Sequence, residues 1–288
     1  MWNNSLTCAE RPNVSFVALA SFLKDDSRVL TLGVRPTLGD YSPEERRRLR
    51  QALCVLFPTV RFADVLEAGG CRCFPSAATY RYQRWRPLQW TLAAFLNLPR
   101  VQTRLCYGQK AKRDIRSRFS PPFRVMGPRS GKDAMVLVES WRDWPAAAAS
   151  LRHPWLVMDW VPYRWQEDVW VACGMVVAQR TGMWNGANEP QWGPWVAVFR
   201  TDPKEALLRH SLWVCRSSHI DEAVLSWGRL DGSPNVFFEG LHKPPPVLTV
   251  GEEKHDRHRI AFSALLQNMS NVLEPPLPEK GFTRREEA

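Results

Sequence analysis

The sequence has no window of eighteen apolar residues, and its first ten residues, MWNNSLTCAE, lack the basic-then-apolar order of a secretory signal. Neither a membrane-spanning helix nor classical secretion is therefore expected, and we expect a cytoplasmic protein without a membrane partner. The chain also lacks internal repeats. Its 288 residues, 44% of them apolar, are enough to bury a substantial core in one large or two smaller domains.

Cysteine is sparse and irregularly placed. Seven cysteines are an odd number with no repeated spacing, which argues against a disulfide framework in a chain of this length. The C-x-C pair in GCRCFP has no second pair downstream, so a metal site built on it is not favoured. We expect reduced thiols that are buried or half-buried.

The whole chain has a net charge of +10, and acidic residues are scarce in its first part. Residues 1–110 carry 16 basic and 8 acidic groups, whereas residues 201–288 carry 11 and 13. The densest basic run, residues 100–119, has seven Lys or Arg against one Asp. Such a run can bind nucleotide phosphates or RNA, although it is more often a solvated helix face. Nucleic-acid binding therefore stays open, without a recognised module to support it.

The N-terminal part alternates strand-like and helix-like segments. Residues 14–23 and 29–34 are apolar enough for buried strands. Ser42 is a typical N-cap, because Pro43 and Glu45 follow it at the first and third helical positions. Leucines at helical spacing then predict that this helix continues to Leu56. A second amphipathic helix is expected over residues 87–98 and a third over 111–119.

The C-terminal part is rich in Val, Trp and Phe and predicts more strands, at residues 135–140, 155–161, 167–180, 195–200 and 235–240. Helices are expected between and after them, at 143–152, 203–216 and 258–269. The fold class is therefore α/β followed by α+β with antiparallel sheet. We expect one domain over residues 14–110, a second over 111–272, and a disordered tail over 273–288 that is rich in Pro and charge.

A series of short phrases shows a family resemblance over roughly residues 29–245. These phrases are RPTLGDYSPEERR, LFPTVRFADVLEAGGCRCFPSAATYRY, LPRVQTRLCYGQKAKRDIRSRFSPPF, WLVMDWVPYRWQEDVWVACGMVVA and NVFFEGLHK. In order and spacing they resemble ATP-grasp proteins, specifically the bacterial glutathione-synthetase-like branch. The resemblance implies an N-terminal α/β domain and two α+β subdomains that hold ATP between them with Mg²⁺. It also implies activation of a carboxylate as an acyl phosphate, which an amine then attacks.

The segment GPRSGKD, residues 127–133, looks like a phosphate-binding loop but is not a P-loop. Only three residues separate its glycines, and Asp133 follows Lys132 where a P-loop has a hydroxyl residue. The resemblance places it at the loop that covers the phosphates of ATP. There Arg129, Ser130 and Lys132 can donate hydrogen bonds to an anion. The alternative is a solvated surface hairpin.

The family's functional positions are poorly kept. Five positions that usually hold a cation, a metal carboxylate or a metal-binding amide hold other residues, namely Pro87, Met126, Trp170, Ser226 and Leu241. The acidic residue of the hinge phrase survives as Asp159, and the expected metal carboxylate survives as Glu239. One such carboxylate is too few for a pair of magnesium ions. The loss of a single preorganised charge often costs about 10²-fold to 10³-fold in rate.

These departures favour a divergent ATP-grasp protein that lacks ordinary ligase turnover. Its cleft is expected to bind a nucleotide or another anion, with Lys110, Lys112 and Arg180 adding positive charge near the residues of the loop. ATP with Mg²⁺ is the implied cofactor, and a protein partner that docks on the cleft is a further expectation. The alternatives are an active ATP-dependent carboxylate-amine ligase acting on an amino acid or peptide, and a basic nucleic-acid-binding protein.

Tryptophan is unusually common. Nine of the fourteen tryptophans lie within residues 141–195. At alternate strand positions such residues usually fill a core, although tryptophans interleaved with Arg can also stack on rings or bases. The segment MWNGANEPQWGPW, residues 183–195, predicts an exposed loop where family members have a substrate-side loop, and its tryptophans indicate a changed ligand.

Overall fold

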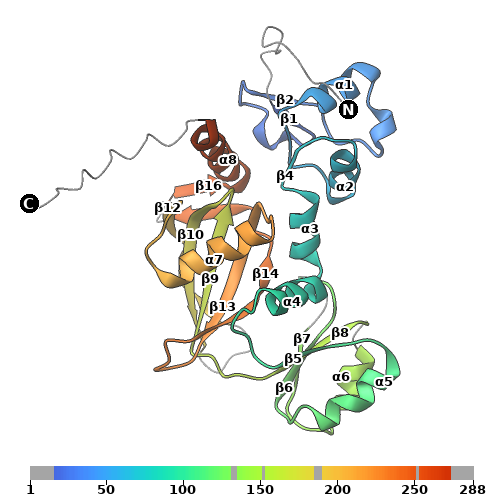
Figure 1. Cartoon of the computed structure of the whole chain (residues 1–288), viewed down its shortest axis with the longest axis vertical. Helices are drawn as coiled ribbons and strands as arrows, with labels where there is room; N and C mark the ends of the chain where they lie inside the picture. Colours follow the sequence, from blue (N-terminus) through green and yellow to red (C-terminus); the bar gives the residue numbers. More distant parts are fainter. Residues whose placement is uncertain (1–15, 131–134, 151–152, 185–189, 251–252, 274–288) are drawn as a thin grey trace, which may run out of the picture.

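The computed structural model describes residues 16–130, 135–150, 153–184, 190–250 and 253–273. Its N-terminal part is a four-stranded parallel sheet in the order β2-β1-β3-β4 (Figure 1). The strands are β1 (Phe16–Ala18), β2 (Val29–Thr31), β3 (Cys54–Leu56) and β4 (Cys73–Phe74). The helices beside them are α1 (Pro43–Gln51) and α2 (Val60–Ala68), with short 3₁₀ turns at Ser21–Leu23 and Leu38–Asp40.

The predicted start of α1 is confirmed, and its predicted end is wrong. The Ser42 hydroxyl accepts a hydrogen bond from the Glu45 amide at 3.2 Å, while the Glu45 carboxylate accepts one from the Ser42 amide at 2.7 Å. The helix ends at Gln51, since Ala52 has an extended backbone and the next residues form β3. A fully buried Cys54–Leu56 run is more favourable as a central strand than as a further helical turn. The expected strand over 14–23 is likewise shorter, because a 3₁₀ turn replaces its second half.

The second sheet is antiparallel, in the order β5-β8-β6-β7. Its strands are β5 (Thr103–Cys106), β6 (Phe123–Met126), β7 (Met135–Val138) and β8 (Trp155–Asp159). One face packs on α5 (Gly108–Arg113), a 3₁₀ turn (Asp114–Ser117) and α6 (Trp144–Ser150), at the lower right of Figure 1. β5 precedes residue 110 and pairs with β8, which follows it; the domain boundary at residue 110 stays a prediction.

The third sheet is the largest. Its strands run in the order β11-β10-β9-β13-β14, and β12 also pairs with β10. They are β9 (Trp165–Ala172), β10 (Met175–Met183), β11 (Gln191–Trp192), β12 (Val196–Arg200), β13 (Glu222–Arg229) and β14 (Val236–His242). The single strand expected over 167–180 is two strands, because Cys173 and Gly174 turn the chain with φ of +47° and +75°.

Helices cover both faces of the large sheet. α7 (Ala206–Ser217) packs on the face that carries Val169 and Trp227. The other face packs on α8 (Arg257–Leu273), which follows a hairpin of β15 (Val247–Val250) and β16 (Glu253–Asp256), and on the N-terminal sheet. The mixed α/β and α+β fold class is therefore confirmed.

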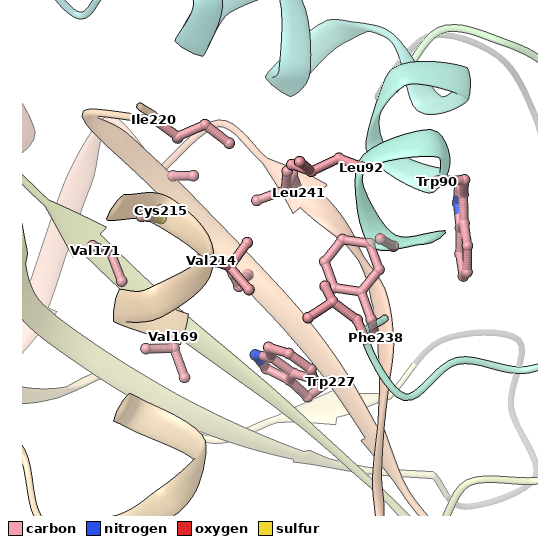
Figure 2. Packing of buried hydrophobic residues seen from close by; sticks show 14 of the residues in the cluster. Trp90, Leu92, Val169, Val171, Val214, Cys215, Ile220, Trp227, Phe238 and Leu241 are labelled. Carbon is pink, nitrogen blue, oxygen red and sulfur yellow. The ribbon is translucent and has the colours of Figure 1, made fainter. Parts of the chain in front are cut away.

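Two helices, α3 (Ala77–Arg84) and α4 (Arg86–Phe95), connect the three sheets. Figure 2 shows α4 beside β14, with Leu92 next to Leu241 and Trp90 near Phe238. Gln89 of α4 joins the two elements, since its side-chain amide donates to the Leu241 carbonyl at 2.7 Å and its oxygen accepts from the Leu241 amide at 3.2 Å. The same buried core continues to β6 and β8 of the second sheet.

Two further sequence predictions are tested by these residues. The six described cysteines, Cys54, Cys71, Cys73, Cys106, Cys173 and Cys215, are all unpaired and buried, as expected; Cys8 lies outside the described residues. Within the described ranges, no helix is long and apolar enough to cross a membrane. The predicted tail over 273–288 lies almost wholly outside the described part of the chain.

Candidate functional site

Three neighbouring strands of the large sheet bring a carboxylate, a guanidinium and a hydroxyl together. The antiparallel register places Asp168 of β9 directly opposite Arg180 of β10 on one side and Ser226 of β13 on the other. Directly opposite residues point to the same face of a sheet. The pairing of the strands therefore builds this cluster, although its members lie far apart in the sequence.

Both oxygens of Asp168 are occupied. Oδ2 accepts hydrogen bonds from Nε of Arg180 at 3.0 Å and from Nη2 at 2.7 Å, and Oδ1 accepts one from the Ser226 hydroxyl at 2.5 Å. Asp168 is 3% exposed. The Arg180 guanidinium lies 4.0 Å from the ring centre of Trp192 and 4.8 Å from that of Trp195. Cation–π contacts and the ion pair thus hold Arg180 in place.

Nη1 of Arg180 makes no hydrogen bond to another described residue. Arg180 lines a pocket of about 310 Å³ that we call the Arg180 pocket. The residues of its lining used below are Asp168, Arg180, Trp192, Trp195, His242 and Lys243. Lys243 keeps exposed surface. The protein around its amine, and to a smaller extent the charge of Arg257, lower the pKa of Lys243.

His242, at the end of β14, links the Arg180 pocket to the glycine-containing loop. The Ser130 hydroxyl lies 3.4 Å from its Nδ1. The loop, residues 127–130, is fastened to the junction of α3 and α4. The Arg86 amide donates to the Pro128 carbonyl at 2.8 Å, and the Ser130 amide donates to the Arg84 carbonyl at 2.9 Å. These contacts hold Ser130 beside His242, which lines the pocket.

Four charged groups act on the same imidazole. His242 keeps exposed surface, but crowding by the surrounding protein lowers the pKa of His242. The carboxylates of Asp168 and Glu239 oppose this shift, and the guanidinium groups of Arg86 and Arg180 add to it. All four charges therefore lie within electrostatic reach of His242.

Glu239, the predicted metal ligand, lies in a buried ion pair. Its carboxylate lies 2.8 Å from Nη1 of Arg124 in an ion pair, and it accepts hydrogen bonds from Nη2 at 3.1 Å and from the Tyr163 hydroxyl at 2.6 Å. The side chains of Arg124 and Glu239 are 5% and 8% exposed. Burial alone would lower the pKa of Arg124, but the ion pair outweighs it and the pKa is raised. The Arg124 guanidinium also lies 5.4 Å from the ring centre of Trp160.

These residues do not fit a magnesium ion. Magnesium in phosphate sites is bound by one or two carboxylates in addition to phosphate oxygens. Both oxygens of Glu239 and both of Asp168 are already bonded to cations or hydroxyls. Among the residues that the structure describes, no group of three His, Cys, Asp or Glu side chains could hold a metal ion. Glu239 does not fit a metal ion because Arg124 occupies its carboxylate, and the sequence alone did not reveal this pairing.

The other predicted site residues are distributed unevenly. Arg180 lines the Arg180 pocket, Ser130 contacts His242 of its lining, and Arg129, next to Ser130, forms a backbone bridge with Trp85. Lys110 is on α5, which packs on the face of the second sheet opposite to Arg124, so the structure does not bring Lys110 to His242. The Lys112 side chain and Lys132 lie outside the described residues.

Asp159 ends β8 and is half-buried, and burial raises the pKa of its carboxyl group. It makes no side-chain hydrogen bond or ion pair with another described residue. Its role in ligand binding stays a prediction, as do the roles of the other predicted residues.

Sequence reasoning missed His242, Lys243, Arg124 and Tyr163. The first two directly follow the phrase FFEGL, and this position at the end of a strand was the available signal. Arg124 lies within an apolar strand, where an arginine needs a buried partner. The sequence did not show which acidic residue that partner is, because the two lie 115 positions apart.

Comparisons with known proteins give matches in structure alone. No protein-family model matches the chain, and neither does any curated protein. A structure of the ATP-grasp ligase PsnB with a phosphomimetic variant of its minimal precursor, Mg and ADP is 10% identical, with a TM-score of 0.58 over 89% of this chain and 99% of that one. A RimK domain ATP-grasp protein from Sphaerobacter thermophilus is 15% identical, with a TM-score of 0.54 over 78% of this chain and 89% of that one.

The ADP complex of PurK, N5-carboxyaminoimidazole ribonucleotide synthetase, is also similar. It is 12% identical, with a TM-score of 0.56 over 80% of this chain. The match spans 63% of the PurK chain, which is less than two thirds of its length. At these identities the likeness concerns the fold.

Proposed function

We propose that this chain, which has the ATP-grasp fold, is a binding protein that holds a nucleotide or another anion at the Arg180 pocket and lacks ordinary ligase turnover. The observation that carries the proposal is the state of Glu239, whose carboxylate is bonded to Arg124 and Tyr163. A carboxylate in this state is not available to hold a metal ion against the phosphates of a reacting ATP.

The charge of the pocket supports an anionic ligand. Asp168 and Arg180 neutralise one another, and the amine of Lys243 adds a positive charge without an ion pair to any described residue. Arg180 lines the pocket and its Nη1 is not used in the bonds to Asp168, so it can donate to an anion; charge-assisted hydrogen bonds to phosphate or carboxylate are the strong ones. Trp192 and Trp195 give the same pocket apolar rings on which a planar group can stack.

An active carboxylate-amine ligase is the second candidate, because the solved structures that this chain resembles include ATP-grasp ligases. On that candidate, Arg180 would hold the carboxylate substrate. Nucleic-acid binding has weaker support. The exposed basic residues of α5 and the following turn lie on the second sheet's outer face, away from the Arg180 pocket.

The test is a thermal-shift titration with ATP and a non-hydrolysable analogue on the wild type and Arg180→Gln. At about a hundred times the dissociation constant, a ligand that binds only the folded state stabilises it by about 2.7 kcal/mol. We expect a rise in Tm in the wild type and a much smaller one in Arg180→Gln. Arg113→Gln, an exposed arginine on α5, is the matched control and should behave as the wild type does.

No shift with either nucleotide, with inorganic phosphate or with pyrophosphate would contradict the proposal. Production of ADP from ATP on addition of amino acids or peptides would favour the ligase instead. A steep salt dependence of oligonucleotide affinity, lost on removal of the α5 arginines, would favour nucleic-acid binding.

A further inference from the structure

We infer that guanidinium groups occupy the carboxylates at which metal ions would otherwise bind, Arg124 at Glu239 and Arg180 at Asp168, and that anion binding at the Arg180 pocket is therefore independent of divalent metal. This inference rests on the proposed function, because it states how the same site binds its ligand without metal. It is independent of whether the ligand is a nucleotide or a smaller phosphate.

Asp168 and Glu239 have the same kind of surroundings. Each is almost fully buried, is paired through two nitrogens of one guanidinium group and accepts a hydrogen bond from a hydroxyl. At Asp168 these partners are Arg180 and Ser226, and at Glu239 they are Arg124 and Tyr163. The two clusters adjoin, because Gly240, the residue after Glu239, lies directly opposite Ser226 in the sheet.

A metal ion would have to displace an arginine from each carboxylate. The displaced Arg124 would then be a buried cation without its counterion, which costs several kilocalories per mole. No other carboxylate is available to stabilise the displaced Arg124 among its contacts with the described residues. Its Nε already lacks a hydrogen-bond partner among these residues, and its guanidinium lies near the Trp160 and Tyr163 rings. The ion pair therefore competes directly with metal binding.

The two arginines have different roles toward a ligand. Arg180 is 27% exposed, lines the pocket and bonds to Asp168 through Nε and Nη2, so its Nη1 can bond to an anion without breaking those bonds. Arg124 is buried and keeps the Glu239 carboxylate paired, so that this carboxylate does not recruit a metal ion. The favoured ligand is therefore a free anion with its full charge. Magnesium, which neutralises ATP and pyrophosphate in solution, should weaken binding or leave it unchanged.

The first experiment is isothermal titration calorimetry of sodium pyrophosphate and of ATP into the full chain, in metal-free buffer and with excess MgCl₂. We expect binding in metal-free buffer, with no gain on addition of magnesium. Arg180→Gln should weaken it by roughly tenfold to a hundredfold, the effect of losing a charge-assisted hydrogen bond. Glu239→Gln should raise the metal-free affinity, because Arg124 then loses its internal counterion.

The result that overturns the inference is binding that requires magnesium and is lost in Glu239→Gln. That result would leave the proposed anion-binding function standing. Absence of binding by both anions in both buffers would instead contradict the proposed function, and the inference with it.

A second measurement tests the metal directly and needs no anion. Titration with Mn²⁺, followed by electron paramagnetic resonance, should detect no ion held at Glu239 in the wild type. Arg124→Gln should gain a bound Mn²⁺, and the double variant Arg124→Gln, Glu239→Gln should lose it again. A wild-type Mn²⁺ signal that Glu239→Gln abolishes would overturn the inference, even if Arg124→Gln failed to fold.

Discussion

Arg124 of β6 and Glu239 of β14 join the two antiparallel sheets by an ion pair of 2.8 Å and a hydrogen bond of 3.1 Å, and neither side chain is more than 8% exposed. The pair lies where the second and third sheets share one hydrophobic core. It therefore affects both the stability of the fold and the charge of the site.

Removal of one partner of this pair should be strongly destabilising. Arg124→Met leaves Glu239 as a buried charge without a counterion, and we expect a loss of about 3–5 kcal/mol in the free energy of unfolding. The double variant Arg124→Met, Glu239→Gln keeps an acceptor for Tyr163 and removes both charges, so it should recover much of that loss. Urea unfolding followed by circular dichroism measures both. Equal losses in the two variants would show that packing, not charge, dominates.

The capping box of α1 gives a smaller, local prediction. Ser42→Ala removes the hydroxyl that accepts the Glu45 amide, and it should cost about 1 kcal/mol. Ser42→Asp retains an acceptor and should cost less. The measurement is again the midpoint of urea unfolding. A neutral Ser42→Ala would mean that the parallel sheet alone fixes the start of α1.

His258 predicts a dependence of stability on pH. Its ring stacks on Phe22 at 3.6 Å and meets Phe57 edge-on at 4.6 Å. Burial, with a smaller effect from Arg257, lowers the pKa of His258 from its ordinary value of 6.5. The unfolded chain therefore binds a proton more readily than the folded one does, so stability present above pH 6.5 is lost as the pH falls below it.

The slope due to His258 should be at most about 1.4 kcal/mol per pH unit. His258→Phe keeps a stacked ring and cannot bind a proton, so this part of the pH dependence should disappear. Unfolding curves at several pH values between neutral and acid measure the difference. An identical pH profile in the variant would contradict the assignment to His258.

The aromatic rings beside Arg180 predict an optical signal. Trp192 lies 4.0 Å from the guanidinium, so an anion that binds Arg180 should change the fluorescence of this indole. Trp192→Leu should weaken the anion affinity a few-fold, because the guanidinium loses a cation–π contact that holds its plane. Trp213→Leu is the control, since Trp213 is 43% exposed on α7 and does not line the Arg180 pocket. Because Trp195 lines the same pocket, a fluorescence change that survives replacement of both Trp192 and Trp195 by Leu would place the ligand elsewhere.

Much of the fold could be predicted from the sequence. Order and spacing of phrases predicted the ATP-grasp fold, which the solved structures confirm; the glutathione-synthetase-like branch stays a prediction. Local rules placed the starts of α1 and α4, because capping residues and an N-terminal proline act within one helical turn. The continuation of α1 to Leu56 failed because burial in a central strand outweighed helical periodicity.

The candidate site was only partly predictable. Arg180, Ser130 and Glu239 were expected near one another. In the structure Ser130 contacts His242, Arg180 lines the same pocket as His242, and the Glu239 carboxylate affects the pKa of His242. The partners of the two carboxylates were not foreseen. Asp168 meets Arg180 through strand register, and Glu239 meets Arg124 through the packing of two sheets. Neither relation is encoded in the spacing of residues along the chain.

Gln89 of α4 has a consequence for the outer boundary of the large sheet. β14 is a terminal strand, and such strands expose unpaired amides and carbonyls that can recruit a strand from another molecule. At Leu241 the carboxamide of Gln89 satisfies both groups, as a neighbouring strand would. A helix side chain thus takes the place of a further strand at this buried edge, and Gln89→Ala should destabilise the fold because it leaves the Leu241 amide and carbonyl buried without partners.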